Sequence, residues 1–405
     1  MNYKNIFKMR VSLYTLMLLS LMISVGLSQD FMSSWGNGYK LTSSDGDHNL
    51  KFGGRIMYDF VAWDNDSDSL GSFLGTEFRR IRFFHSGTVY GNVNYKLQID
   101  FAGGGVSLKD VYIETAIPYL GNLRVGHFKE PFRLEALTSS KYITFLERAL
   151  PIAFSPERNA GLMIHNSFID DRLSVQVGLF AEATDGNNKN IDNVWNRMGR
   201  LTFVPMKDAS KLLHLGVSMS DRLSADSTFS FSTRAENHLG NKLLDLEMSG
   251  IHNMNLIGTE MAFVMGSFSI QGEYLMTSLD KDGDGVWNGS HNDNLSSYYG
   301  QLSYFLTGET RNYKNSLSGF GRVKPNKNMK KGEGWGALEL AARYSSMDLS
   351  DSHSGELNDI TLGLNWYLNP CTRLMFNYVM GSVTHHDMEN PEKENVFQAR
   401  IQIDF

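Results

Sequence analysis

Apolar and polar residues alternate one by one in many short runs along this chain of 405 residues. In the clearest run, at 92–101, every second residue from Val93 to Phe101 is apolar and the residues between them are polar. A period of two residues predicts a β-strand with one apolar and one polar face. Sixteen such runs lie at 51–63, 76–90, 92–102, 107–117, 122–129, 159–169, 173–182, 197–206, 211–221, 254–264, 268–279, 297–309, 335–348, 356–368, 372–385 and 395–405. The pattern therefore predicts an all-β fold.

The lengths of the connections separate a soluble sandwich from a membrane barrel. Short turns alternate with longer links, which lie at 64–75, 130–158, 183–196, 222–253, 280–296 and 386–394. Short turns at one rim and long loops at the other are typical of outer-membrane barrels. Two links depart from this pattern, because 103–106 is short on the long-loop side and 310–334 is long on the short-turn side. We therefore predict a 16-stranded antiparallel transmembrane β-barrel over 50–405. The segment 130–158 is then either a surface loop or a constriction within the lumen.

The N-terminal region has the features of an export signal. Three basic residues, Lys4, Lys8 and Arg10, precede an uncharged apolar stretch at 11–27, and small residues stand before a cut ahead of Gln29. We predict a cleaved secretory signal peptide at 1–28, with a retained membrane anchor as the alternative. The polar segment 29–49 that follows is expected to be mobile. The last alternating run ends in Phe405, which resembles the insertion signal of outer-membrane proteins.

Composition narrows the class of protein further. No later stretch has the roughly 18 uncharged apolar residues of a membrane-spanning helix. The single cysteine, Cys371, cannot form an intrachain disulfide, and a net charge of −6 gives no basic footprint for nucleic acid. We expect the outer membrane of a Gram-negative bacterium, with its lipid as a partner and with no nucleic acid and no cofactor.

A set of short motifs is spread over the expected mature chain. The motifs lie at 53–55, 78–80, 101–106, 108–110, 124–132, 134–141, 143–149, 233–236, 271–274, 321–325 and 365–370. Together they resemble the phosphate-selective porin O and P family. This resemblance implies a 16-stranded barrel, usually a homotrimer, whose third long loop, here 130–158, folds into the pore as a constriction loop. It also implies that anions pass cationic side chains and an eyelet of arginines, a lysine and loop serines.

The arginines at 79, 80 and 82 are candidates for this pathway, because arginine binds phosphate-like groups with two parallel hydrogen bonds. Since Ile81 and Phe83 suit the lipid face, Arg80 and Arg82 should face the lumen and Arg79 should point outward. A β-bulge or the barrel rim could turn Arg79 inward, and a subunit interface is another place for it. The alternative role for lumen arginines is structural pairing with lumen acids, such as Asp100, Asp110 and Glu114.

The remaining pathway candidates are Asp100, Lys129, Ser139, Ser140, Lys141 and Arg234. Ser139, Ser140 and Lys141 could equally form a loop turn or a helix cap. Two departures from the family pattern argue against tight phosphate selectivity. Ala136-Leu137 stands where phosphate-selective members carry a lysine, and Arg234 stands alone where such members carry an arginine ladder. A general or weakly anion-preferring porin for small solutes is therefore the main expectation.

Two further segments carry chemistry. Seven lysines and arginines at 310–334 form either a cationic patch on the periplasmic side or a solvated linker. Asp280, Asp282 and Asp284 resemble the start of a calcium-binding loop, although a polar turn explains them too. No serine elbow or phosphate loop indicates an enzyme. The alternative function is a non-conducting barrel that acts in surface adhesion or assembly, with loops 222–253 and 280–296 as its binding surface.

Overall fold

The computed structural model describes residues 31–65, 72–183, 195–224, 227–281, 292–386 and 390–405. The predicted signal peptide lies outside these residues. In the part of the chain that is described, no helix combines the length and apolar character needed to cross a membrane.

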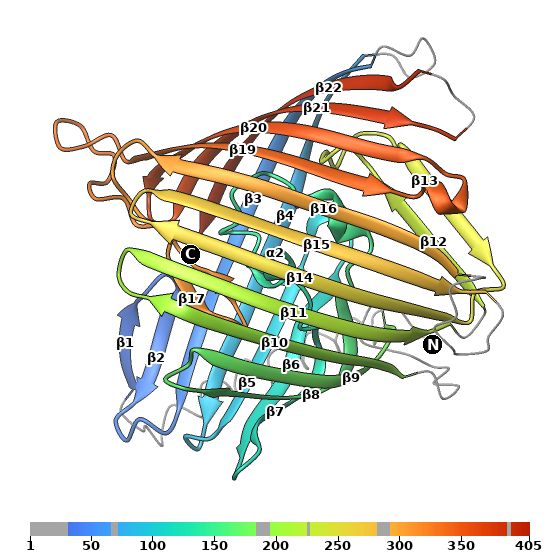
Figure 1. Cartoon of the computed structure of the whole chain (residues 1–405). Coiled ribbons are helices and arrows are strands. Elements are labelled where there is room, and N and C mark those ends of the chain that lie inside the picture. Colours follow the sequence, from blue (N-terminus) through green and yellow to red (C-terminus); the bar gives the residue numbers. More distant parts are fainter. Residues whose placement is uncertain (1–30, 66–71, 184–194, 225–226, 282–291, 387–389) are drawn as a thin grey trace, which may run out of the picture.

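Sixteen long strands form a closed antiparallel barrel, which confirms the predicted fold class (Figure 1). They are β3 (Asn49–Asn65), β4 (Phe73–Val89), β5 (Val93–Asp100), β6 (Ser107–Ile117), β7 (Gly121–Lys129), β8 (Arg158–Phe168), β9 (Leu173–Ala181), β10 (Asn196–Lys207), β11 (Lys211–Leu223), β14 (Asn253–Met265), β15 (Phe268–Asp280), β16 (Asn292–Phe305), β19 (Ala337–Asp348), β20 (Glu356–Asn369), β21 (Thr372–Thr384) and β22 (Glu392–Asp404). The last strand closes the barrel on the first, with Asp404 opposite Arg55 and Glu394 opposite Asn65.

The two faces of the wall follow the alternation in the sequence. On β22, the side chain of Arg400 is directed to the interior and is 2 % exposed, whereas Ile401 on the outer face is 52 % exposed. Large apolar residues cover the outer faces of the other strands in the same way, for example Leu362 and Phe397. An apolar outer surface around a polar interior is the arrangement that a lipid bilayer requires of a barrel.

The N-terminal segment contains two strands that the sequence did not predict. Residues 29–49 were expected to be a mobile segment, and in the described part of it β1 (Phe31–Trp35) and β2 (Tyr39–Ser43) form an antiparallel hairpin. The hairpin extends the wall, because Tyr39 of β2 pairs with Phe52 of β3. The polar composition of this segment concealed its strands, which depend on the neighbouring edge of the barrel.

Two long connections contain short hairpins of their own. Within 222–253, β12 (Thr228–Thr233) pairs with β13 (Leu244–Ser249), and within 310–334, β17 (Tyr313–Asn315) pairs with β18 (Gly319–Phe320). Phe231 and Leu244 of the first hairpin are buried in one hydrophobic cluster with wall residues such as Trp63, Leu279 and Val383. This region of the interior is therefore packed protein, and the loop 222–253 contributes to that packing instead of forming only a surface for adhesion.

The connection 130–158 contains a short helix, α2 (Leu134–Leu137), and a 3-10 turn, η3 (Leu150–Ala153). It joins β7 to β8, yet its backbone carbonyl groups accept hydrogen bonds from inward side chains of strands that are distant in the sequence. Arg373 on β21 donates to the carbonyl of Ile143 at 2.9 Å, and Arg400 on β22 donates to that of Leu146 at 2.6 Å. These contacts hold the connection in the interior of the barrel.

Candidate functional site

A cavity of about 910 Å³ lies between the inner faces of β3 to β8 and the inserted connection 130–158. The loop after β12 and the segment 314–320 complete its lining. Cationic groups outnumber carboxylates among the lining residues. Fourteen lysines and arginines face five carboxylates, the cations being Lys51, Arg55, Arg79, Arg80, Arg82, Lys96, Lys109, Arg124, Lys129, Lys141, Arg148, Arg158, Arg234 and Lys314, and the acids being Asp110, Glu114, Glu147, Glu157 and Glu236. The wall of this cavity is therefore strongly basic in an acidic protein.

A β-bulge in β4 brings adjacent arginines to the same side of the wall. The register with β3 shifts so that Met57 faces Arg80 and Tyr58 faces Phe78, which leaves Arg79 without a partner in the ladder. Phe78 consequently points outward and is 51 % exposed, while Arg79 and Arg80 both line the cavity. Strict alternation would have turned Arg79 outward, and the bulge is the alternative by which it turns inward.

Several of the cations are neutralised by ion pairs. Arg79 binds both oxygens of Glu147, at 2.8 and 2.9 Å, in the two-pronged geometry of a guanidinium on a carboxylate. The other pairs on this wall join Arg82 to Asp100 at 2.6 Å, Lys96 and Arg158 to Asp110 at 2.5 and 2.8 Å, Arg124 to Glu114 at 2.6 Å, and Lys141 to Asp404 at 3.1 Å. The structural pairing that the sequence left open thus applies to Asp100, Asp110 and Glu114.

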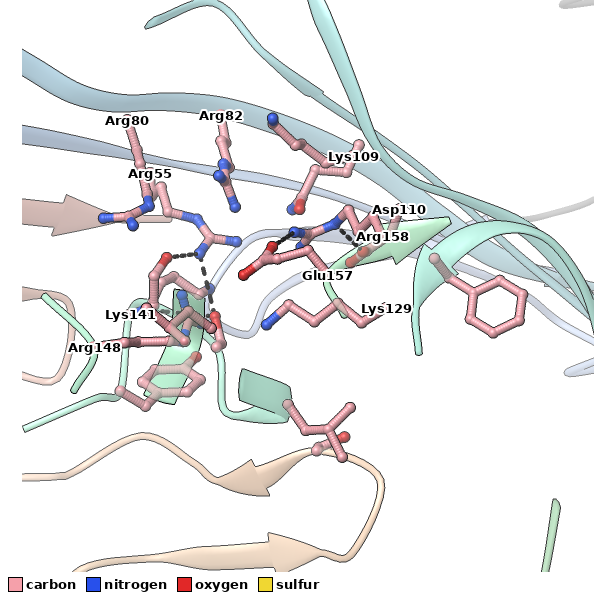
Figure 2. Close-up of a pocket in the computed structure, with 18 of the residues that line it drawn as sticks. Arg55, Arg80, Arg82, Lys109, Asp110, Lys129, Lys141, Arg148, Glu157 and Arg158 are labelled. Atoms are coloured by element: carbon pink, nitrogen blue, oxygen red, sulfur yellow. Dashed lines mark hydrogen bonds and ion pairs between the residues drawn. The ribbon is translucent and has the colours of Figure 1, made fainter. Parts of the chain in front are cut away.

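A second group of cations has mainly neutral partners (Figure 2). Arg55 donates to the hydroxyl oxygens of Ser139 and Ser140, at 3.2 and 2.7 Å. Lys129 donates to the carbonyl of Ala136, and Arg148 donates to the carbonyl groups of the same short stretch of the connection. Within the described ranges, Arg55, Lys129 and Arg148 form no salt bridge. Glu157 is the carboxylate that acts on two of them, because burial raises its pKa but Arg148, Arg158 and Lys129 together outweigh burial and lower the pKa to about 2. Among the described residues it nevertheless forms no direct ion pair with Lys129 or Arg148.

Arg80 belongs with this second group. Its closest carboxylate is Glu147, whose oxygen lies 3.9 Å from the guanidinium, at the outer limit of an ion pair. The Nε of Arg80 is buried and has no hydrogen-bond partner. Figure 2 shows Arg55, Arg80 and Arg82 directed from the wall toward the region that Lys129, Lys141 and Arg148 border from the other side. Among the cavity cations that have no carboxylate oxygen within 3.5 Å in the described residues, we call Arg55, Arg80, Lys129 and Arg148 the unpaired cations below.

Glu147 is the carboxylate that holds three arginines of the interior in place. Burial by itself raises the pKa of this carboxyl, but Arg79, Arg80 and Arg400 together outweigh burial and hold the pKa well below its usual range. Glu147 therefore stays ionised at neutral pH and fixes the arginines around it. One carboxylate from the inserted connection thus bridges β4 and β22, the two strands that flank β3 in the wall.

The structure places the other predicted residues as follows. Lys141 and Ser139 line the cavity, and Arg234 lines it too while its Nε donates to the carbonyl of Gly240 at 2.7 Å. Asp280 ends β15, whereas the two other calcium candidates, at 282 and 284, lie outside the described residues. Over the described part of the chain, no three His, Cys, Asp or Glu residues are arranged to hold a metal ion.

The basic segment 310–334 also differs from one expectation. A solvated linker was the alternative to a cationic patch, but residues 311–322 of this segment fold against the interior. Phe320 is 1 % exposed and its amide donates to the hydroxyl of Thr138 at 3.3 Å, while Arg311 donates to Gln271 at 3.1 Å. The linker interpretation is therefore wrong for this part, because aromatic and arginine side chains dock on the connection 130–158 and on the wall.

Sequence reasoning missed several cations of the site. Arg55 and Lys96 lie at inward positions of alternating strands, so their parity alone could have identified them. Lys109 precedes Asp110 where β5 and β6 have an irregular register, and alternation fails there. Arg148 lies in a connection with no periodicity, so no local pattern could have assigned it.

Comparisons with known proteins agree with this geometry. The family model described as phosphate-selective porin O and P matches residues 50–405. Porin O of Pseudomonas aeruginosa is 27 % identical to this chain, and the alignment covers 93 % of each protein. An uncharacterised protein of Caulobacter vibrioides is 28 % identical, with 92 % of this chain and 77 % of that protein covered.

Solved structures show the same fold at low identity. An anion-selective porin from Comamonas acidovorans has a TM-score of 0.58 at 12 % identity and covers 88 % of this chain and 100 % of its own. A trimer form of OmpT from Vibrio cholerae has a TM-score of 0.52 at 13 % identity, with 88 % and 99 % covered. The sixteen-stranded barrel, its basic interior and the match over 50–405 lead to one assignment. The chain belongs to the phosphate-selective porin O and P family and is an outer-membrane porin of a Gram-negative bacterium.

Proposed function

We propose that this porin prefers small anions of the phosphate type, and that the unpaired cations provide the preference. The observation that carries the proposal is the group of Arg55, Arg80, Lys129 and Arg148 around one cavity, beside the hydroxyls of Ser139 and Ser140. An ion that enters a narrow pore loses part of its hydration shell, and it needs charges and hydrogen-bond donors to replace it. These side chains supply both.

The same contacts suggest moderate affinity. Lys129 and Arg148 already donate to backbone carbonyl groups of the connection, and Arg55 donates to two serine hydroxyls. An anion must compete with these acceptors, although a serine hydroxyl can rotate and donate to the anion in turn. The absence of a lysine at 136–137 points in the same direction. We therefore propose an anion preference with weak retention of phosphate, instead of tight phosphate binding.

Planar-bilayer recordings test this function. With a potassium chloride gradient across the bilayer, the sign of the reversal potential reports whether chloride or potassium passes more easily. We expect an anion preference, and we expect added phosphate to reduce the chloride current only at millimolar or higher concentration. A cation preference would overturn the proposal. Absence of any conductance would favour the non-conducting alternative instead.

We further propose that the protein assembles as a homotrimer. The support is family membership together with the trimer form of the OmpT structure, which shares the barrel fold. Chemical cross-linking of the protein extracted in a mild detergent tests this assembly, because a trimer gives a ladder that ends at three subunits. If only the band of the single subunit appeared, the result would contradict the trimer.

A further inference from the structure

Asp404 is a buried acid at the C-terminal end of the last barrel strand. It ends β22 and is 2 % exposed. Its Oδ1 accepts a hydrogen bond from Nη1 of Arg322 at 3.0 Å, and its Oδ2 accepts from Nη2 of the same arginine and from Nζ of Lys141 at 3.1 Å. A single carboxylate therefore serves two cations that come from two different inserted segments.

The two cations occupy different places. Lys141 belongs to the connection 130–158 and lines the basic cavity. Arg322 belongs to the segment 310–334 and is not among the residues that line the cavity, although it contacts the hydroxyl of Tyr142, which does, at 3.3 Å. It also donates to the carbonyl of Pro370. Lys141, Arg322 and Asp404 together carry one net positive charge, so Asp404 removes half of the positive charge that the two cations would otherwise place beside the pathway.

Arg55 is the cross-strand neighbour of Asp404. The two residues are register partners of β3 and β22, and both side chains are buried in the interior. Side chains directly opposite one another in a sheet have Cβ atoms about 5 Å apart, which is within reach of an ion pair. Nevertheless, the carboxylate of Asp404 is bound by Lys141 and Arg322, and Arg55 donates to Ser139 and Ser140 instead.

We propose that Asp404 is a positioning residue that sets how strongly the pore attracts anions. It compensates the charge of Lys141, and Arg322 keeps its carboxylate away from Arg55, which leaves Arg55 free to meet an anion. This inference rests on the proposed anion preference. A conducting pore benefits from such compensation, because an ion must be attracted enough to enter and held weakly enough to leave.

The proposal gives opposite expectations for the two partners of this contact. Asp404→Asn keeps the size of the side chain and adds one net positive charge beside the pathway. We expect a stronger anion preference and half-block of the chloride current at a phosphate concentration roughly fivefold lower, which is the effect of one charge near 4 Å in a water-like medium. Arg322→Gln frees the carboxylate to pair with Arg55, so it should weaken the anion preference although Arg322 does not line the cavity.

The experiment compares reversal potentials and phosphate half-block of the full-length protein and its variants in planar bilayers. Asp404→Glu is the matched control, because it keeps the carboxylate and should behave like the unmodified protein. The double variant Lys141→Gln/Asp404→Asn should lie between its two single variants. If Asp404 had a purely structural role, the anion preference of these variants would not follow the charge that each substitution adds or removes.

Two results would overturn the inference while the proposed function stands. One is an anion-preferring protein whose preference does not change in Asp404→Asn. The other is an Asp404→Asn variant with a weaker anion preference. If Asp404→Asn does not assemble into a barrel, Arg322→Gln decides, and an unchanged or stronger anion preference in that variant counts against the inference. A cation preference of the unmodified protein would overturn the proposed function first.

Discussion

At the scale of single residues, the interior is organised by which cations have a carboxylate partner. Glu147 binds Arg79 at 2.8 Å and Arg400 at 2.9 Å, and Arg400 in turn binds both oxygens of Asp59 at 2.6 Å. This chain of ion pairs stabilises a wall that would otherwise carry several repelling charges. Arg55, only 6 % exposed, has serine hydroxyls instead of a carboxylate. The paired residues therefore stabilise the interior, and the proposed anion preference rests on the unpaired ones.

Glu147 gives a prediction about acid stability. Because its pKa is lower in the folded protein than in the unfolded chain, its carboxylate stabilises the fold above the unfolded value of about 4.3, and this contribution is lost as pH falls through the folded value. We expect Glu147→Gln to lower the free energy of unfolding by about 2 kcal/mol at pH 7, since it leaves arginines without their partner. Below about pH 4 the difference from the unmodified protein should shrink.

Unfolding of the detergent-solubilised barrel in urea, measured between pH 7 and pH 3, checks this prediction. Glu182→Gln is a suitable control, because the side chain of Glu182 is 64 % exposed and its buried partner Arg222 keeps Glu130 as a second carboxylate at 3.1 Å. Its effect should be small across this range. If Glu147→Gln lost stability in parallel with the unmodified protein at every pH, Glu147 would not be the group that titrates.

At the scale of elements, the bulge in β4 is the irregularity with the largest consequence. Sixteen strands could be predicted because a period of two residues is a local property of the sequence. The bulge could not, because Phe78-Arg79-Arg80 fits either an outward or an inward Arg79 until β3 is placed beside it. The same limit applies to the inserted segments. Their positions depend on contacts between residues far apart in the chain, such as Thr138 with Phe320, and no periodicity reports such contacts.

We expect that a one-residue deletion removes the bulge without disturbing the rest of the strand. Since residues 79 and 80 are both arginine, deletion of either one gives the same chain, in which Phe78 points outward, the remaining arginine inward and Ile81 outward. We expect this variant to form a barrel with the normal heat-modifiable mobility on gels and a weaker anion preference. Deletion of Val379, in the regular ladder of β21, should instead invert half a strand and prevent assembly.

A deletion variant of the arginine pair that fails to assemble, while other deletions at the rim are tolerated, would show that the bulge is required for folding. A variant that assembles with full anion preference would show that one arginine at this place is enough. Only a barrel with reduced preference agrees with two inward arginines acting on the same cavity.

The segment 310–334 gives a prediction of its own. Phe320 packs in a cluster with Leu134 of the inserted connection, and the guanidinium of Arg311 lies 3.7 Å from the centre of its ring. We expect Phe320→Ala to cost about 3 kcal/mol, as is usual when a buried aromatic side chain is truncated. Loosening of the segment should also raise the single-channel conductance. Urea unfolding and bilayer recordings measure the two effects.

For Phe320→Ala, the exposed Tyr119 offers a comparison, since Tyr119→Ala removes an aromatic ring from the rim and should change neither quantity. An unchanged conductance together with lost stability would mean that the segment supports the fold without shaping the pathway. If neither stability nor conductance changed, the packing of Phe320 would contribute to neither.

At the scale of the whole molecule, the barrel is divided into a packed part and a basic part. The hairpin of β12 and β13 fills one region with apolar side chains, whereas the cavity against β3 to β8 keeps charged walls. The closed sheet and its rims could be predicted from strand spacing alone. The division could not, because inward apolar residues such as Leu279 and Val383 look like any other departure from alternation until the hairpin covers them.

The central claim is that the basic side of the barrel makes the pore prefer anions, and one measurement tests this claim most directly. This is the reversal potential in a potassium chloride gradient for the unmodified protein and for the double variant Arg55→Gln/Arg80→Gln. Arg197→Gln is the control, because the side chain of Arg197 is 70 % exposed and lies outside the cavity. We predict an anion preference that the control keeps and the double variant largely loses. An unmodified protein that prefers potassium, or a double variant with undiminished anion preference, would contradict the account.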